Sequence, residues 1–262
     1  MVLVFLLISL AASTAGAICG IGGGVVIKPV LDLFLLGDVA SISFLSGNTV
    51  LAMTLYSVGM SLLKREGKVD LRLGTPLAIG GILGGVAGKQ LFECAIAHFG
   101  DGNTVGAFQA GGLLALTLGT LHYTLKRDLI RSHRVGGIPA CLGIGAGLGL
   151  VSTFLGIGGG PINLVALHYF FSMPTKTAAQ NSLYIILFSQ AASLGLTLAG
   201  GTVPDFHPLV LAAMAAGGVG GGVLGRFVNK RIGHKEADKL FVGLMAVIIL
   251  ICVYNLWRFT TT

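Results

Sequence analysis

The stretch "GIGGG" occurs twice in this chain of 262 residues, at 20–24 and again at 156–160. Each copy lies inside a strongly apolar segment, where four glycines in five residues interrupt a helix. The apolar runs that flank each copy are shorter than the ~20 residues that a full membrane span requires. We therefore interpret the flanks as half-helices that meet at the glycines, either as re-entrant segments or as two thin spans.

The composition places the whole chain in a membrane. It is 54% hydrophobic and 10% charged, whereas soluble proteins are nearer a quarter charged. Uncharged apolar runs such as 105–125 and 240–257 have the length of membrane helices. No stretch is polar enough for a soluble domain, so we expect a single all-α membrane domain. The net charge of +7 comes mostly from Lys and Arg in short loops, which set topology, so we expect no nucleic-acid partner.

The chain is also an internal repeat. Matched motifs keep their order along the two halves while their offsets drift between 131 and 137 residues, which indicates an old duplication. We place the repeats at 1–132 and 133–262, with about eight to ten membrane segments in all. The matched sets are 20–24 with 156–160, Asn48 with Asn181, 84–89 with 221–226, Tyr123 with Tyr254, and Arg127 with Arg258.

Loop charges predict the orientation of these segments. Basic residues crowd the loops 64–72, 126–134 and 230–239, which we place in the cytoplasm. The loops 101–103 and 200–207 carry no Lys or Arg and are placed outside. Equivalent loops fall on opposite sides, so we predict inverted repeats, both termini outside, and a multi-pass protein of the plasma (inner) membrane. Many secondary transporters have this architecture, with sites near the membrane midplane at the repeat interface.

The glycines at the two breaks are candidates for the ligand site. Most of the 42 glycines serve close helix packing, but GIGGG is denser and recurs in register. Backbone N–H groups freed at the start of a half-helix suit an anion, and irregular backbone at membrane depth needs protein or a water-filled cavity around it. We predict a polar cavity between the breaks. The predicted backbone donors are Gly22, Gly23, Gly24, Gly158, Gly159 and Gly160.

Polar side chains follow the breaks in both halves. Asn48 and Thr49 in the first half align with Asn181 and Ser182 in the second. Amides and hydroxyls can donate to an oxyanion without carrying charge, and we predict these four as substrate-binding side chains. The alternative is hydrogen bonding between helices, which the pattern leaves open. Further candidates of lower weight are Cys19, Ser46, Gln180 and Gln190.

Four charged residues are additional candidates. Lys28 and Asp32 have the i, i+4 spacing of an ion pair in a short apolar segment, where binding and snorkelling are equally open. Lys89 and Arg226 occupy equivalent positions and could attract anions at opposite mouths of a pathway, although we favour snorkelling. Proton coupling through Asp32 stays open beside simple uniport. No pattern implies a metal site or a cofactor.

These features together resemble the TauE/SafE family of sulfite exporter-like anion permeases. The resemblance rests on GIGGG with a following proline in both halves, Pro29 and Pro161, and on the polar stretches 41–49 and 175–182. It covers essentially the whole chain and implies a plasma-membrane secondary carrier for sulfite or small organosulfur anions. Two departures are that Pro161 follows its glycines at once, and that the family's Gly-Thr-Ser is Gly-Asn-Thr here in one half and Gln-Asn-Ser in the other.

We therefore predict a secondary transporter that moves a small anion, sulfite or an organosulfur anion, by alternating access between the two breaks. The alternatives are an anion channel and a carrier for a different small solute. An enzyme is not expected, because the chain holds no HExxH, GxSxG or phosphate-loop motif and its histidines mostly fall at segment ends. The expected partners are the anion and the lipid bilayer, and a homodimer is left open.

Overall fold

The computed structural model describes residues 2–34, 38–64, 69–99, 102–157 and 159–261. Gly158, one of the predicted donors, lies outside the described residues. Within these ranges the structure is all helical and holds no strand, which confirms the all-α fold class. The helices are α1 (Val2–Cys19), α2 (Gly24–Leu33), α3 (Val39–Leu63), α4 (Leu71–Phe99), α5 (Gly102–Lys126), α6 (Ile138–Phe154), α7 (Pro161–Phe171), α8 (Thr175–Ala199), α9 (Pro208–Arg231) and α10 (His234–Thr261), with a short 3-10 turn at Arg127–Leu129.

Seven of the helices in the described ranges are long and apolar enough to cross a membrane. They are α1, α3, α4, α5, α8, α9 and α10, whereas α6 and α7 are apolar but shorter. A chain with this many membrane-length helices and so few charges is a multi-pass membrane protein.

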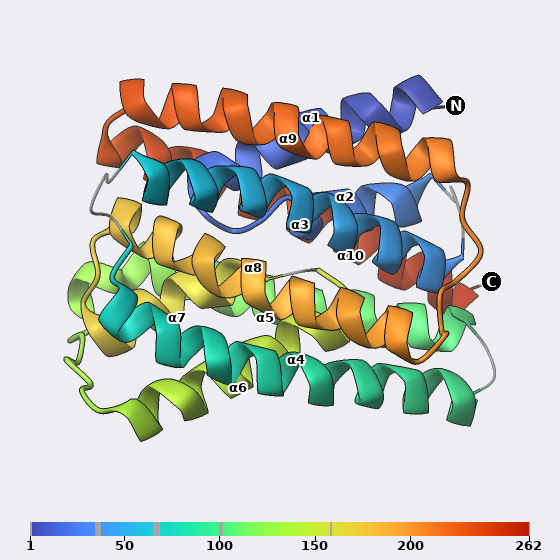
Figure 1. The fold of residues 1–262 in the computed structure, drawn as a ribbon, viewed down its shortest axis with the longest axis horizontal. Helices are drawn as coiled ribbons and strands as arrows, with labels where there is room; N and C mark the ends of the chain where they lie inside the picture. Colours follow the sequence, from blue (N-terminus) through green and yellow to red (C-terminus); the bar gives the residue numbers. More distant parts are fainter. Residues whose placement is uncertain (1, 35–37, 65–68, 100–101, 158, 262) are drawn as a thin grey trace.

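The segments that GIGGG interrupts fold back as two helical hairpins (Figure 1). We call α1 with α2 hairpin 1, and α6 with α7 hairpin 2. In hairpin 2, the N–H groups of His133 and Val135, just ahead of α6, donate to carbonyls at the end of α7 at 2.7 and 2.8 Å. In hairpin 1, Arg258 near the C-terminus donates to the Leu33 carbonyl that ends α2. Each hairpin therefore begins and ends at the same end of the bundle, which is the arrangement that the re-entrant interpretation of the GIGGG flanks predicts.

The two hairpins enter from opposite ends of the bundle. Figure 1 shows both chain termini at one end, together with the last turn of α4, the first turn of α5 and the α8–α9 connection. We call this the terminal end, and we call the opposite end, which holds the Lys- and Arg-rich connections, the basic end. Hairpin 1 enters from the terminal end and hairpin 2 from the basic end. The loop charges predict this same grouping of connections, and which end faces the cytoplasm stays a prediction.

The helices pair in a pattern that two related halves would produce. α1 packs along α9 and α4 packs along α6, while α3 packs on α9 and α4 on α8. Exchanging α1–α5 with α6–α10 converts each of these pairs into its counterpart. Both long pairs are close because glycines face backbone, as at Gly84, where a Cβ would collide with the Ala146 carbonyl. The pairing supports the duplication, while the inverted relation and the boundary between 132 and 133 stay predictions.

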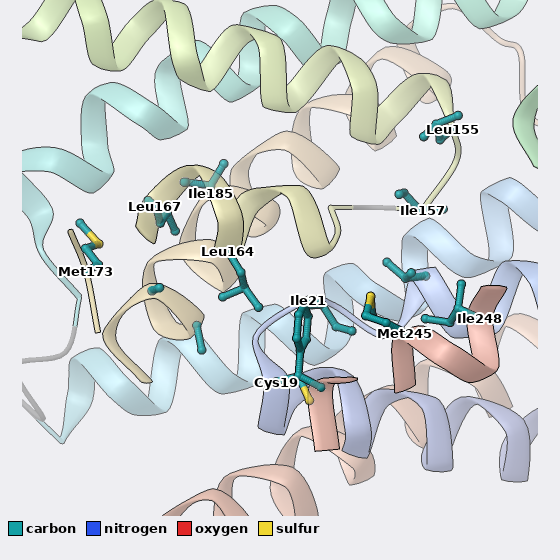
Figure 2. Close-up of a cluster of buried hydrophobic side chains, with 14 of the residues drawn as sticks. Cys19, Ile21, Leu155, Ile157, Leu164, Leu167, Met173, Ile185, Met245 and Ile248 are labelled. Atoms are coloured by element: carbon teal, nitrogen blue, oxygen red, sulfur yellow. The ribbon is translucent and has the colours of Figure 1, made fainter. Parts of the chain in front are cut away.

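The first two residues of each GIGGG end a helix and anchor the hairpin tip. Gly20 and Gly156 have φ of +74° and +66°, a conformation that glycine adopts without strain. The following N–H groups, of Ile21 and Ile157, donate to carbonyls five residues earlier, which is the hydrogen bond of a glycine-terminated helix. Both isoleucines are fully buried in one cluster of apolar side chains (Figure 2). The repeated Gly-Ile thus turns the chain and fixes the tip in the core.

The two tips touch at the centre of the bundle. Gly24 is the first residue of α2, and a Cβ placed on it would lie 2.2 Å from the carbonyl oxygen of Ile157. Only glycine permits this approach of α2 to the tip of hairpin 2. The two breaks are therefore brought together, and at this contact the space between them is filled by protein.

Candidate functional site

A cavity of about 190 Å³ lies at the terminal end, beside the tip of hairpin 2. Its walls come from α3, α4, α8 and the α8–α9 connection, and its floor includes Gly156. This volume is many times the ~10–15 Å³ that a single water needs. We call it the terminal cavity. Its polar lining residues are Ser43, Asn48, Lys89, Glu93, Thr153, Gln190, Ser193, Thr197 and Thr202.

The floor of the terminal cavity presents two hydroxyl groups beside Gly156. The Ser43 Oγ lies 2.7 Å from where a Cβ on Gly156 would stand, so both conformation and space require glycine there. Ser43 Oγ and Thr153 Oγ1 are buried and have no hydrogen-bond partner within the described part of the chain. Buried hydroxyls normally find a partner, so these two keep unused hydrogen-bonding capacity at the cavity floor.

Two amides form the wall above this floor. Asn48 donates one N–H to the Phe44 carbonyl at 2.9 Å, which leaves its second N–H and its carbonyl oxygen for other partners. Gln190 reaches from α8 towards α3, where its Oε1 would lie 2.8 Å from a Cβ on Gly47. Glycine at that position therefore makes room for the Gln190 amide.

Lys89 places a positive charge inside the terminal cavity. Its ammonium donates to the Thr197 hydroxyl and lies 3.4 Å from Glu93 Oε1. The Lys89 side chain is 12% exposed and that of Glu93 is 42% exposed, so the cation is the deeper member of the pair. Thr202 donates to the same carboxylate at 3.1 Å. Lys89 thus points into a polar cavity, where snorkelling would have carried it to the surface.

Several predicted side-chain donors lie away from the terminal cavity. Thr49 donates to a carbonyl one turn earlier and packs against Gly218 of α9. Asn181 accepts the N–H of Asp70 at 3.0 Å, just ahead of α4, and donates to its own helix. Ser182 is fully buried, with no partner for its hydroxyl among the described residues. Asn48 and Asn181 are therefore equivalent in the repeat but differ in surroundings, because only Asn48 lines the cavity.

The predicted backbone donors are packed against protein. Gly23 lies on Ser13 of α1, and Gly159 lies on Ile186 of α8. Of the described motif residues, Gly156 lines the terminal cavity, and it was not among the predicted donors. A role in anion binding stays a prediction for the other described glycines, which are Gly22, Gly23, Gly24, Gly159 and Gly160.

The remaining candidates occupy three other places. Lys28 and Asp32 form a buried ion pair at 3.3 Å, with exposed fractions of 3% and 7%, so Lys28 does not snorkel. The stem of Lys28 lies against Gly156, behind the cavity floor. Ser46 is buried and its hydroxyl lacks a partner within the described ranges. Cys19 and Gln180 line two smaller cavities at the basic end.

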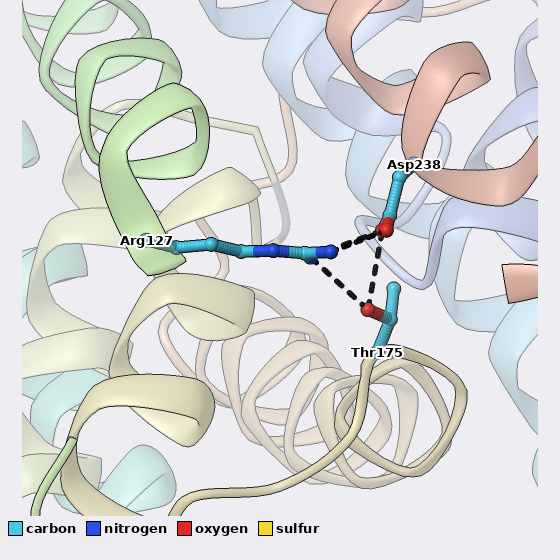
Figure 3. Close-up of polar contacts among 3 residues, drawn as sticks. All are labelled: Arg127, Thr175 and Asp238. Atoms are coloured by element: carbon cyan, nitrogen blue, oxygen red, sulfur yellow. Dashed lines mark hydrogen bonds and ion pairs between the residues drawn. The ribbon is translucent and has the colours of Figure 1, made fainter. Parts of the chain in front are cut away.

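A polar cluster closes the basic end near Cys19. Arg127 donates to both carboxylate oxygens of Asp238 at 2.5 and 3.2 Å and to the Thr175 hydroxyl at 3.3 Å (Figure 3). Thr175 in turn donates to Asp238 at 3.1 Å. These contacts join the residue that follows α5 to the first turns of α8 and α10, and they flank a cavity of about 40 Å³ that reaches Cys19. The described residues hold no His, Cys, Asp and Glu group that could bind a metal ion.

Comparison with known proteins places this architecture in a family. A family model described as "Sulfite exporter TauE/SafE" matches residues 5–252. The chain belongs to the TauE/SafE family. This TauE/SafE protein is 23% identical over 270 residues to the "Probable membrane transporter protein YunE" of Bacillus subtilis (strain 168), a match that covers 95% of the chain and 94% of the relative. No solved structure matches it. The resemblance found in the motifs of the sequence is thereby confirmed.

Besides Gly156, sequence reasoning missed the two residues that carry hydroxyls on the cavity floor of this TauE/SafE protein. It looked for polar residues shared by both repeats, and Thr153 aligns with Ala17 while Ser43 aligns with Lys176. The one feature of the sequence that could have identified these two residues is their position. Thr153 stands three residues ahead of the second GIGGG, and Ser43 stands one turn ahead of Gly47 on the same helix.

Proposed function

We propose that this protein is a secondary transporter that moves a small anion, sulfite or an organosulfur anion, across the plasma membrane by alternating access. Three observations support the proposal: membership of a family described as sulfite exporters, a relative described as a probable membrane transporter, and a polar cavity at the tip of a re-entrant hairpin. By the loop charges, the terminal cavity faces the outside.

The observation that carries the proposal is the convergence of uncharged donors and one cation on a single cavity. The residues that bring these groups come from four helices and line the same cavity: Ser43 and Thr153 with hydroxyls, Asn48 and Gln190 with amides, and Lys89 with an ammonium. Such donors fit the several oxygens of an oxyanion, and hydrogen bonds to an ion are stronger than those between neutral groups. A site made mostly of neutral donors also lets its ion leave, which transport requires.

The test is counterflow of labelled sulfite in proteoliposomes, with sulfate, thiosulfate and sulfoacetate as competitors. We expect exchange that unlabelled sulfite on the far side accelerates, and that the double substitution of Ser43→Ala with Asn48→Ala strongly reduces. Lys239→Gln, at an exposed position of α10, is the control that should leave exchange unchanged. Folded protein that exchanges none of these anions would overturn the proposal. Flux without acceleration by far-side substrate would instead indicate a channel.

One observation favours a second candidate, a carrier for a small zwitterion. Glu93 lies beside Lys89 in the terminal cavity, so the site offers a carboxylate as well as an ammonium. A small aminosulfonate could then place its acid group at Lys89 and its ammonium at Glu93. Glu93→Gln separates the two candidates, because it should speed exchange of an anion and abolish exchange of the zwitterion.

A further inference from the structure

A second cavity at the basic end repeats the terminal cavity. It has a volume of about 10 Å³, and we call it the basic cavity. Most of its lining residues are the repeat counterparts of residues that line the terminal cavity, by the same offsets that align the motifs. The matched pairs, basic cavity first, are Ala17 with Thr153, Ser57 with Gln190, Gln180 with Gly47, and Arg226 with Lys89, and two more pairs follow one turn along α9 and α4.

The two cavities differ mainly in how far they are open. The terminal cavity holds about 190 Å³, whereas the 10 Å³ of the basic cavity is close to the room that one water needs. Two halves with matched residues can form the same cavity at either end, and in this structure the terminal cavity is open while the basic cavity is nearly closed. The pairing of α4 with α8 around the open cavity corresponds to the pairing of α9 with α3 around the shut one.

Arg226 links the two helices that border the basic cavity. Its guanidinium donates to the carbonyl oxygens of Ser57 at 3.2 Å and Met60 at 3.1 Å, in the last turns of α3. Carbonyls at the end of a helix carry the negative end of its dipole, so the cation binds them well. Asn229, one turn along α9, donates to the Ile18 carbonyl at the end of α1 at 2.7 Å. These bonds tie α9 to α3 and to the tip of hairpin 1.

Lys89, the counterpart of Arg226, bonds differently. Its partners among the described residues are the side chains of Thr197 and Glu93, in place of backbone carbonyls at a helix end. Lys89 thus reaches from α4 to a side chain of α8 across the open cavity, whereas Arg226 reaches from α9 to backbone carbonyls of α3 across the closed one. Gln180 also lines the basic cavity, and its buried Oε1 has no partner within the described residues. A closed cavity thus keeps both a cation and an amide of the kind found in the open one.

We infer that the basic cavity is the closed counterpart of the terminal cavity, and that Arg226 is both its gate and its anion contact. When α9 and α3 separate, the guanidinium exchanges the carbonyls of Ser57 and Met60 for an oxyanion that has reached this end. The planar fork of arginine suits an oxyanion, because two parallel N–H groups can donate to two of its oxygens. The inference rests on the proposed function and adds the residue that opens the second side.

The test is labelling of single cysteines from each face of the membrane. In full-length protein whose four native cysteines are replaced, Ser57→Cys reports on the basic cavity and Ser193→Cys on the terminal cavity. A membrane-impermeant maleimide is added to right-side-out or inside-out vesicles. We expect Ser193→Cys to react from one face and Ser57→Cys to be protected from both. Adding Arg226→Gln should make Ser57→Cys react from the opposite face at least about tenfold faster, because two charge-assisted hydrogen bonds are lost.

The coupled change at the other cavity is the sharper readout. If Arg226 is a gate, Arg226→Gln should also slow labelling of Ser193→Cys, because the molecule opens at the basic end by closing at the terminal end. If Arg226→Gln only left a hole at the basic cavity, the rate at which Ser193→Cys is labelled would not change. Arg226→Met fills most of that space without the hydrogen bonds and should act like Arg226→Gln. Unchanged labelling of both cysteines in both variants would overturn the inference.

Sulfite tests the anion contact separately. In the Arg226→Lys variant, which keeps the charge and lacks the fork, we expect partial opening and protection of Ser57→Cys by sulfite that is at least about tenfold weaker than with Arg226. Equal protection with either residue would refute the anion contact. Cysteine labelling needs no substrate, so it tests the gate independently of transport. If the labelling changes are as expected but the protein exchanges no sulfite, the proposed substrate is wrong and the gate is retained.

Discussion

Replacing Gly24 by alanine tests whether the two hairpin tips touch. A Cβ on Gly24 would lie 2.2 Å from the Ile157 carbonyl oxygen and 3.0 Å from Val50 Cγ2. The first obstacle is backbone, which cannot rotate away, so the tips would have to separate by roughly 1 Å to restore van der Waals contact. Overpacking of a core costs about 1–3 kcal/mol, and we expect the upper part of that range here.

The assay is thermal unfolding of purified protein in detergent, followed by the fluorescence of intact material in size-exclusion chromatography. A cost of about 2–3 kcal/mol corresponds to a fall of roughly 5–10 °C in the midpoint for a chain of this size. Gly59→Ala is the matched control, because it lies in α3 with nothing within 4 Å of the added Cβ. It should melt at the same temperature or slightly higher, since alanine favours the helix. Equal midpoints for the two variants would refute the contact between the tips.

Three further predictions concern polar residues. Lys89→Gln should raise the half-saturating anion concentration roughly tenfold or more, whereas Lys239→Gln should not; equal transport kinetics would exclude Lys89 from the site. Asn181→Ala should lower the free energy of unfolding by about 1 kcal/mol, because the partly buried N–H of Asp70 ahead of α4 loses its acceptor, and an unchanged melting temperature would contradict this role. Asp238→Asn should cost about 1–2 kcal/mol by removing the carboxylate from Arg127, and recovery of stability by a second Arg127→Gln change would identify the pair as the cause.

The membrane helices could be predicted because each rests on local chemistry. Apolar runs long enough to span a bilayer, short polar connections and glycine breaks are all visible along the chain, and the predicted runs 105–125 and 240–257 lie within α5 and α10. The grouping of connections at two ends followed from Lys and Arg counts, which depend on sequence alone. Whether the flanks of GIGGG were re-entrant could not be predicted, because that depends on what the short helices pack against.

The site was harder to predict because it depends on which face of each helix meets the cavity. Asn48 and Thr49 are neighbours in the sequence, yet on a helix they point about 100° apart, so one lines the cavity and the other faces α9. Asn181 aligns with Asn48 but holds the start of α4. Matching the repeats identifies equivalent positions in the sequence. In a single conformation the two halves of the protein differ, so equivalent positions have different surroundings.

The parallel packing of α1 against α9 has a consequence for the synthesis of the protein and its insertion into the membrane. The small side chains of Ser9 and Ser13 rest on Gly217 and Gly221, which the ribosome adds some two hundred residues later. At about 5–20 residues per second, α1 waits on the order of ten seconds or more in the bilayer for its partner. During that time hairpin 1 lacks its contacts with α9 and with the tip of hairpin 2. The nascent chain therefore needs a chaperone within the membrane. Either half made alone would lack the helix contacts that the other half supplies, and would not fold completely.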